Sequence, residues 1–139
     1  MRKAKVTDLD AIIKLVKENF SFAWETTGRK FHAKFFRNKM LKAIKKDIFL
    51  VEEHKNELIA FGWASKEKDY FGNPIGEINL LVVKKEYQGK GIGSKMLKTL
   101  ETKLKTKDLR LECLCINPAH KLYKQKGYNE FWITYRKIF

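Results

Sequence analysis

Apolar and polar residues alternate with two different periods along the chain, and the change of period predicts alternating helices and strands. Between residues 7 and 20 the apolar positions recur every three to four residues, as Leu9, Ile12, Ile13, Val16 and Phe20 do. This spacing is typical of a helix, and Thr7 with Asp10 resembles a capping box at its start. A second helix is predicted over 30–46, where an apolar stripe lies opposite lysines.

Short apolar runs bounded by turn residues predict the strands. They fall at 2–6, 48–53, 57–65, 76–84, 109–116 and 132–138. The polar turn 54–56 predicts a hairpin, and 20–29 and 66–75 are expected to be loops. Two further helices are predicted, over 91–106 and around Tyr123. We therefore expect a single α/β domain over residues 1–139, with a mixed central sheet of about six to seven strands flanked by about four helices.

The composition is that of a folded chain with a strongly basic surface. Of the 139 residues, 44% are hydrophobic and 33% are charged, and the formal net charge is +14. No apolar run exceeds four residues, so we expect neither a membrane-spanning helix nor a signal-peptide core. We therefore expect a cytoplasmic protein. The lysines are spread over every segment, which favours a generally solvated surface over a dedicated nucleic-acid face.

The predicted strand 76–84 runs into a glycine-rich segment that opens a helix. Gly89, Gly91 and Gly93 let the backbone turn and approach a ligand closely, so we expect a phosphate or pyrophosphate at the helix N-terminus. A P-loop is disfavoured because Lys90 precedes a glycine rather than Ser or Thr. A dinucleotide fingerprint is disfavoured because Met96 stands where a third glycine is needed.

Two motifs resemble those of the GNAT superfamily of N-acetyltransferases. Gln88-Gly89-Lys90-Gly91-Ile92-Gly93 is similar to the family's acetyl-CoA pyrophosphate loop, Gln/Arg-x-x-Gly-x-Gly/Ala. Ala119-His120-Lys121-Leu122-Tyr123, followed by Gly127-Tyr128, is similar to its second signature, Ala-x-x-Leu-Tyr on a helix and then Gly-Phe or Gly-Tyr. The order of the predicted elements agrees with the GNAT fold over essentially the whole chain.

The resemblance implies that acetyl-CoA binds as a co-substrate, at the end of the strand and in the glycine loop. The residues that it assigns to acetyl-CoA are Leu81, Val82, Val83, Gln88, Gly89, Lys90, Gly91, Ile92, Gly93, Ser94 and Asn117. Asn117 stands six residues before Tyr123, where the family usually has seven. No metal is expected, because the three histidines lack the spacing of metal ligands.

The resemblance also implies direct acetyl transfer to an amine within a ternary complex. Tyr123 falls where the family carries the general acid that protonates the departing CoA thiolate, and a backbone N–H near Val83 would face the thioester carbonyl. Glu77, eleven residues before Gln88, matches the general base of the histone acetyltransferase branch. Strand alternation places Glu77 on one face with Asn79, Leu81 and Val83. An ordinary solvated glutamate is the alternative, and Glu112 is a second candidate base.

The acceptor amine is not identified by the sequence. The resemblance implies that the loop 21–29 helps to select it, and both a peptide or protein amine and a small-molecule amine are open. The charge of +14 disfavours a free polyamine relative to a peptide amine or an anionic small amine. Two other classes of function also stay open: a nucleic-acid or ribosome-associated protein that uses its lysines, and a CoA-binding regulator without catalysis.

Residues 129–139 can supply one strand where GNAT chains usually have two. Phe131, Trp132, Tyr135 and Phe139 make this segment too apolar for a free tail. We therefore expect a homodimer in which the segment takes part. The alternative is a strand inserted beside 109–116, with these aromatic side chains in the protomer's own core.

Overall fold

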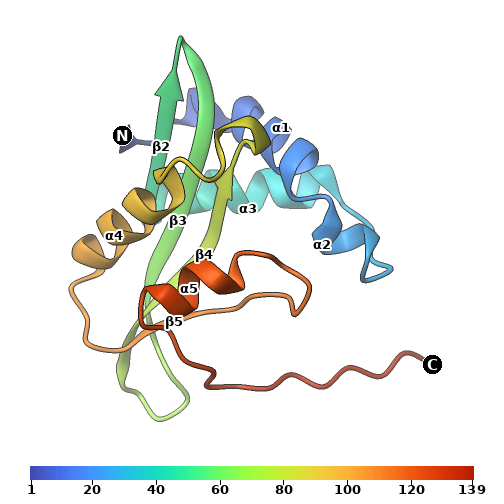
Figure 1. Ribbon diagram of the computed structural model, residues 1–139, viewed down its shortest axis with the longest axis vertical. Coiled ribbons are helices and arrows are strands. Elements are labelled where there is room, and N and C mark those ends of the chain that lie inside the picture. The colour runs from blue at the N-terminus through green and yellow to red at the C-terminus, as the bar shows by residue number, and fades with distance from the viewer.

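A five-stranded mixed sheet forms the centre of the structure, a computed structural model that describes all of residues 1–139 (Figure 1). The strands lie in the order of the chain: β1 (Arg2–Lys3), β2 (Ile48–His54), β3 (Glu57–Lys68), β4 (Pro74–Val83) and β5 (Leu109–Leu111). β1 to β4 pair antiparallel, whereas β5 lies parallel to β4. The predicted α/β architecture with a mixed sheet and the β2–β3 hairpin is confirmed.

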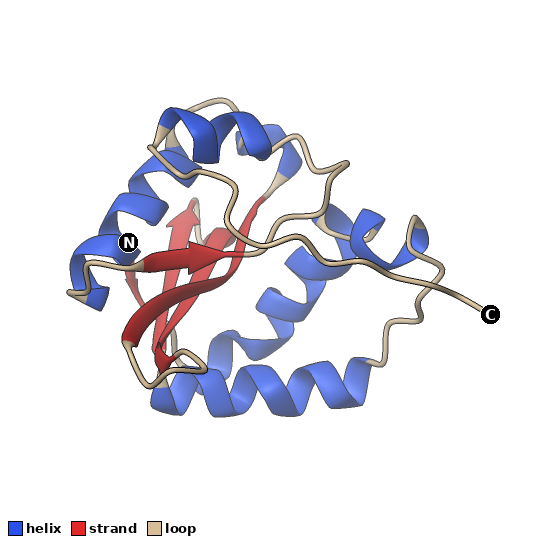
Figure 2. Cartoon of the chain, turned by 90° about the horizontal axis from the view of Figure 1, so that it is seen from below, coloured by secondary structure: helices blue, strands red, loops and turns tan.

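Helices cover both faces of the sheet, so that the molecule has three layers (Figure 2). One face carries α1 (Leu9–Asn19) and α3 (Ala33–Lys46), and the other carries α4 (Ile92–Leu104). Two short helices, α2 (Phe22–Glu25) and α5 (His120–Gln125), complete the five, and the 3-10 turns η1 (Val6–Asp8) and η2 (Lys85–Tyr87) precede α1 and α4. None of the helices combines the length and the hydropathy that a membrane span requires.

Two apolar cores form because neighbouring strand residues point to opposite faces of the sheet. Phe61 of β3 packs with α1 and α3, whereas the adjacent Ala60 packs with α4. The first core contains 13 buried residues and the second contains eight. Phe49 and Phe61 stack in the first core with ring centroids 5.5 Å apart.

Several predicted bounds near the start of the chain and around β5 are wrong. β1 covers two residues rather than 2–6, because the chain turns into η1, where the Asp8 carboxylate accepts a hydrogen bond from the Lys5 N–H (2.7 Å). This bond, rather than a Thr7–Asp10 box, precedes the first helix. The expected loop 20–29 contains α2, and the strand expected over 109–116 ends at Leu111.

The strand predicted over 132–138 does not form, and the sheet has five strands rather than six to seven. Residues 129–139 instead run away from β5 past α2 (Figure 1), where Arg136 Nη1 donates to the Thr27 carbonyl (2.7 Å). The alternative that the aromatic side chains fill the protomer's own core is therefore wrong. Trp132 is 68% exposed and Tyr135 is 90% exposed.

β3 passes close beneath α4 at Gly62, which leads to a prediction about stability. A Cβ atom at this position would lie 2.8 Å from Leu100 Cδ1 and 2.8 Å from Met96 Cγ, and both side chains are fully buried. We expect Gly62→Ala to lower the free energy of unfolding by about 1–3 kcal/mol, measured by urea denaturation, because a packed core resists added volume. Gly93→Ala is the matched control, since its Cβ would meet no atom closer than 3.6 Å. Equal losses in the two variants would contradict the prediction.

Candidate active site

β4 and β5 separate partway along β4 and leave an opening in the sheet. The two strands pair only over Gly76–Ile78 and Leu109–Leu111. Beyond Ile78, β4 continues to Val83, while the chain after Leu111 leaves the sheet (Figure 1). The last five residues of β4 therefore have backbone groups along this edge that no strand of the sheet pairs.

A β-bulge lies where β4 begins to separate from β5. Trp63 pairs with Leu80 and Ala64 pairs with Ile78, so that Asn79 has no partner residue on β3. The Asn79 side chain donates through Nδ2 to Ser65 Oγ (2.9 Å), and Ser65 is only 5% exposed. This hydrogen bond satisfies the buried hydroxyl and ties the extra residue to β3.

The bulge shifts the alternation of side chains along β4, so that residues before and after it no longer share the faces that simple alternation predicts. Glu77 pairs with Ser65 and shares the α1/α3 face with Leu80 and Val82. Leu81 and Val83 lie on the α4 face. The expectation that Glu77 would share a face with Leu81 and Val83 is therefore wrong, because simple alternation assumes a strand without an extra residue.

Six consecutive backbone amides meet between β4 and α4. Gly89 (φ 73°) and Gly91 (φ 82°) adopt left-handed conformations that favour glycine, and the amides of Gly89, Lys90 and Gly91 donate to no protein acceptor. The first helical bond runs from the Lys95 N–H to the Gly91 carbonyl (3.0 Å), so the amides of residues 92–94 also lack intrahelical partners. Such a group of free N–H donors at a helix N-terminus fits an anion of the size of a pyrophosphate.

The loop that carries these amides is attached at three points. The Lys84 N–H donates to the Ile59 carbonyl (2.8 Å), and the Lys85 N–H donates to Asn19 Oδ1 (2.8 Å) at the end of α1. Gln88 Nε2 donates to the Val83 carbonyl (2.9 Å), so this side chain bridges the loop and the end of β4. Asn19 lies 66 residues from Lys85 along the chain, and nothing in the sequence around either residue predicts this contact.

α5 packs beside the N-terminus of α4 and brings Tyr123 to the α4 side of the opening. A Cβ atom at Gly93 would lie 3.6 Å from Leu122 of α5 and 3.7 Å from Val83 of β4, so the three elements meet there. Burial, with a smaller effect from Cys113, raises the pKa of Tyr123 to about 12. The phenol therefore keeps its proton at neutral pH, as a proton donor must. Asn117 Oδ1 accepts a hydrogen bond from the Ala119 N–H (2.9 Å) just before α5.

Glu77 is half-buried, and its carboxylate forms no hydrogen bond or ion pair within the protein. Burial raises the pKa of its carboxyl group, and the negative charges of Glu112 and Glu67 raise it further, against a smaller opposing effect of Arg110. A raised pKa suits a carboxylate that has to accept a proton. Glu112 itself is exposed.

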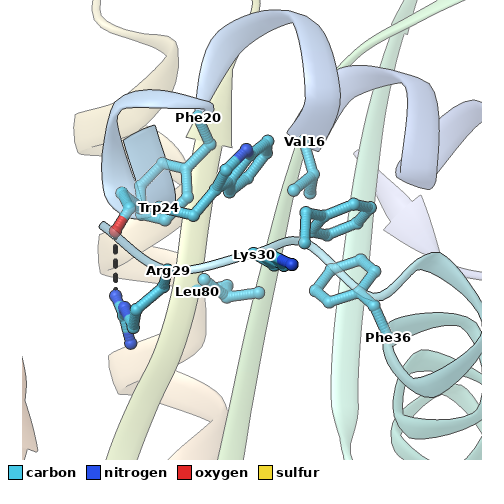
Figure 3. Close-up of a pocket in the computed structure, with 9 residues that line it drawn as sticks. Val16, Phe20, Trp24, Arg29, Lys30, Phe36 and Leu80 are labelled. Atoms are coloured by element: carbon cyan, nitrogen blue, oxygen red, sulfur yellow. Dashed lines mark hydrogen bonds between the residues drawn. The ribbon is translucent and has the colours of Figure 1, made fainter. Parts of the chain in front are cut away.

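An apolar pocket of about 270 Å³ lies on the same face of the sheet as Glu77 (Figure 3). It is lined by Val16, Phe20, Ala23, Trp24, Arg29, Lys30, Phe31, Phe36 and Leu80. Leu80 belongs to β4 and directly follows the bulge, so the pocket reaches the strand that borders the opening. The segment 21–29, expected to help select the acceptor, supplies three of the lining residues.

Comparison with known proteins gives a family and a fold. The model of the acetyltransferase (GNAT) family matches residues 9–128, whereas no curated protein matches the chain. The tetramutant of the BH1408 protein from Bacillus halodurans is similar over 99% of this chain and 98% of its own (17% identity, TM-score 0.87).

Two solved acetyltransferases share the fold at low identity. The PaiA N-acetyltransferase from Thermoplasma acidophilum, in complex with coenzyme A, matches 92% of this chain and 87% of its own (22% identity, TM-score 0.74). An aminoglycoside 6'-N-acetyltransferase from Acinetobacter haemolyticus matches 99% of this chain and 97% of its own (15% identity, TM-score 0.78). The predicted GNAT fold is confirmed.

The unpaired carboxyl group of Glu77 leads to a prediction about stability. Because the folded state raises its pKa, the native protein binds this proton more tightly than the unfolded chain, and stability falls as the pH rises through the folded pKa. We therefore expect Glu77→Gln to raise the thermal unfolding midpoint at about pH 7.5, with a smaller gain at about pH 4, where the carboxyl group is largely protonated in both states. Glu18→Gln, at an exposed position on α1, is the control. A lower midpoint for Glu77→Gln at the higher pH would contradict this sign.

Proposed function

Because the chain belongs to the GNAT acetyltransferase family, we propose that it transfers the acetyl group of acetyl-CoA to a primary amine by direct attack within a ternary complex. The observation that carries the proposal is the row of six free amides over residues 89–94, next to an opening in the sheet. The candidate acid, Tyr123, and the candidate base, Glu77, lie on opposite faces of the sheet.

The pyrophosphate of acetyl-CoA would bind to the amides of residues 89–94, where the dipole of α4 adds a favourable field. Lys90 supplies a positive charge beside them and is held over the Tyr87 ring at 5.2 Å. The free edge of β4 at Leu81, Val82 and Val83 offers backbone partners to the amides of the pantetheine arm. Gln88 would act by holding the loop against Val83, and Asn117 has its Nδ2 left to donate.

When bound, acetyl-CoA supplies an acetyl group activated as a thioester. Glu77 would take a proton from the acceptor ammonium, directly or through a water, so that the amine nitrogen can bond to the acetyl carbon. A backbone N–H near Val83 would stabilise the negative charge on the carbonyl oxygen. As the C–S bond breaks, Tyr123 would give its proton to the thiolate, which leaves as the CoA thiol. The proton that the new amide nitrogen loses would restore the Tyr123 phenol.

The separation of acid and base by the sheet supports this arrangement. Glu77 lies on the α1/α3 face, whereas Tyr123 packs against the α4 core. The amine can approach from the face that carries the apolar pocket, while the thioester approaches from the end of α4. Direct transfer needs two substrates on two sides of one opening, and this geometry provides both sides.

Tyr123→Phe tests the role of the acid. We expect the dissociation constant of acetyl-CoA to change by less than about threefold while kcat falls by about 10²- to 10⁴-fold, because the hydroxyl proton is needed only as the thiolate leaves. Calorimetry measures binding, and the release of the CoA thiol measures turnover. Tyr70→Phe, at a position that is 98% exposed, is the matched control.

Two results would count against the proposal. A folded protein that binds neither CoA nor acetyl-CoA would refute it. A protein that binds acetyl-CoA and releases no CoA with any amine of a broad panel would instead be a CoA-binding regulator. Unchanged turnover in Tyr123→Phe would remove the acid role from Tyr123 and leave acetyl transfer in place.

We also propose that two chains associate through residues 129–139. The segment exposes large apolar side chains, among them Phe131, Ile133 and Ile138, and the outer edge of β5 has no partner strand. Contact between two copies through these exposed side chains would cover apolar surface on both chains and leave each Arg136 at Thr27 of its own chain.

Light scattering at micromolar concentration tests the association. We expect a dimer mass for the whole chain and a monomer mass after deletion of residues 131–139, with circular dichroism as the control for folding. A monomer mass for the undeleted chain would overturn the proposal.

A further inference from the structure

The walls of the apolar pocket are aromatic rings held against one another. Trp24 and Phe31 stack with centroids 4.6 Å apart, and Phe31 meets Phe36 at 5.2 Å. Figure 3 shows Leu80 and Val16 on either side of these rings. At about 270 Å³, the pocket is slightly smaller than the roughly 300–1,000 Å³ typical of sites for drug-sized ligands, which suits one apolar side chain.

The charges around this pocket are positive and unpaired. The chain has five arginines, and Arg2, Arg37 and Arg110 each pair with at least one carboxylate. The other two, Arg29 and Arg136, have no acidic partner, and both hydrogen bond to Thr27 beside the pocket. Lys30 lines the pocket and also lacks an ion pair, and Lys17 Nζ lies 5.8 Å from the centre of the Phe31 ring.

The guanidinium group of Arg29 is fixed but not saturated. Its Nη2 donates to the Ala23 carbonyl (2.9 Å), the bond drawn in Figure 3, and its Nε donates to Thr27 Oγ1 (2.9 Å). A guanidinium has five N–H donors, so three are left. Arg136 Nη1 donates to the Thr27 carbonyl (2.7 Å) and brings a second planar cation to the same residue. Two oriented guanidinium groups without acids suit a carboxylate ligand.

We propose that the acceptor is a free α-amino acid with a large apolar side chain. The side chain would occupy the aromatic pocket, Arg29 with Arg136 would bind the carboxylate, and the amine would face β4. This inference rests on the proposed acetyl transfer, because it places the acceptor on the sheet face that carries Glu77. Leu80, which lines the pocket and directly follows the bulge, connects the two.

The same charges disfavour other acceptors. A polyamine would bring several positive charges to Arg29, Lys30 and Arg136 with no acid lining the pocket. The N-terminal residue of a peptide has no carboxylate next to its amine, so both guanidinium groups would stay without a partner. A small amino acid such as glycine would leave the aromatic walls without a contact.

A matched series of acceptors tests the inference, with CoA thiol release as the readout. We expect kcat/KM for L-phenylalanine to exceed that for L-phenylalaninamide by about 10- to 100-fold, because the amide lacks the carboxylate. It should exceed that for glycine by about 10-fold or more, because glycine lacks the side chain. Spermidine and the dipeptide Phe-Gly should be poorer acceptors than L-phenylalanine.

Two variants assign the carboxylate contact. Arg29→Gln should raise KM for L-phenylalanine about 10- to 100-fold, and far more than it raises KM for L-phenylalaninamide. Arg136→Gln should act in the same direction, and it changes an exposed residue outside any helix or strand, so folding is preserved. Arg37→Gln, which removes an arginine paired with Asp10, is the control and should leave both KM values unchanged.

The outcomes separate this inference from the proposed function. If acetyl-CoA binds and L-phenylalanine is no better than glycine, its own amide or the dipeptide, the amino-acid acceptor is overturned while acetyl transfer to another amine stands. If Arg29→Gln raises KM for L-phenylalanine and for L-phenylalaninamide equally, Arg29 does not bind the carboxylate. If acetyl-CoA does not bind to the folded protein, the proposed function fails and the acceptor inference fails with it.

Discussion

The structure of the site depends on the loss of pairing between β4 and β5. Three residue pairs join these strands, and past Ile78 the edge of β4 is left without a neighbour. A sheet that stayed paired to Val83 would have no passage between its faces and no free backbone groups at the start of the glycine loop. The separation leaves the edge of β4 unpaired and opens the sheet next to the glycine loop.

The β-bulge at Asn79 decides which face of the sheet each β4 side chain near this separation occupies. The extra residue turns Glu77 toward the α1/α3 face while Leu81 and Val83 stay on the α4 face. The Asn79 side chain donates a hydrogen bond to the buried Ser65 hydroxyl, so the bulge leaves no buried side-chain polar atom unsatisfied. The loop that follows is held by contacts to β3, to α1 and to Val83, and its free amides are therefore positioned before any ligand arrives.

The sequence predicts the features whose causes are local. The glycines at 89 and 91 mark positive φ angles, and the helical period after them predicts α4, so the glycine loop at the start of this helix could be located without coordinates. The face of Glu77 could not be predicted, because an unpaired residue on a strand depends on the register with β3. The prediction of a strand over 132–138 was wrong for a related reason. The apolar pattern of this segment suits a strand, but pairing depends on which sheet edge the chain reaches. The pocket is lined by residues from α1, α2, α3 and β4, so no single segment of the sequence predicts it.

The unpaired charges on the α1/α3 face of the sheet form one pattern. Glu77 has no cation bound to it, because Arg110 is engaged by Asp69 and Asp108. Arg29 and Arg136 have no acid, although the chain pairs its other arginines. Each isolated charge costs the folded state some stability, or at least forgoes the gain of a pair. A zwitterionic amino acid carries an ammonium for the carboxylate and a carboxylate for the guanidinium groups, and its side chain fills the apolar space on the same face. Glu77, Arg29 and Arg136 are thus charges to which such a substrate would supply partners.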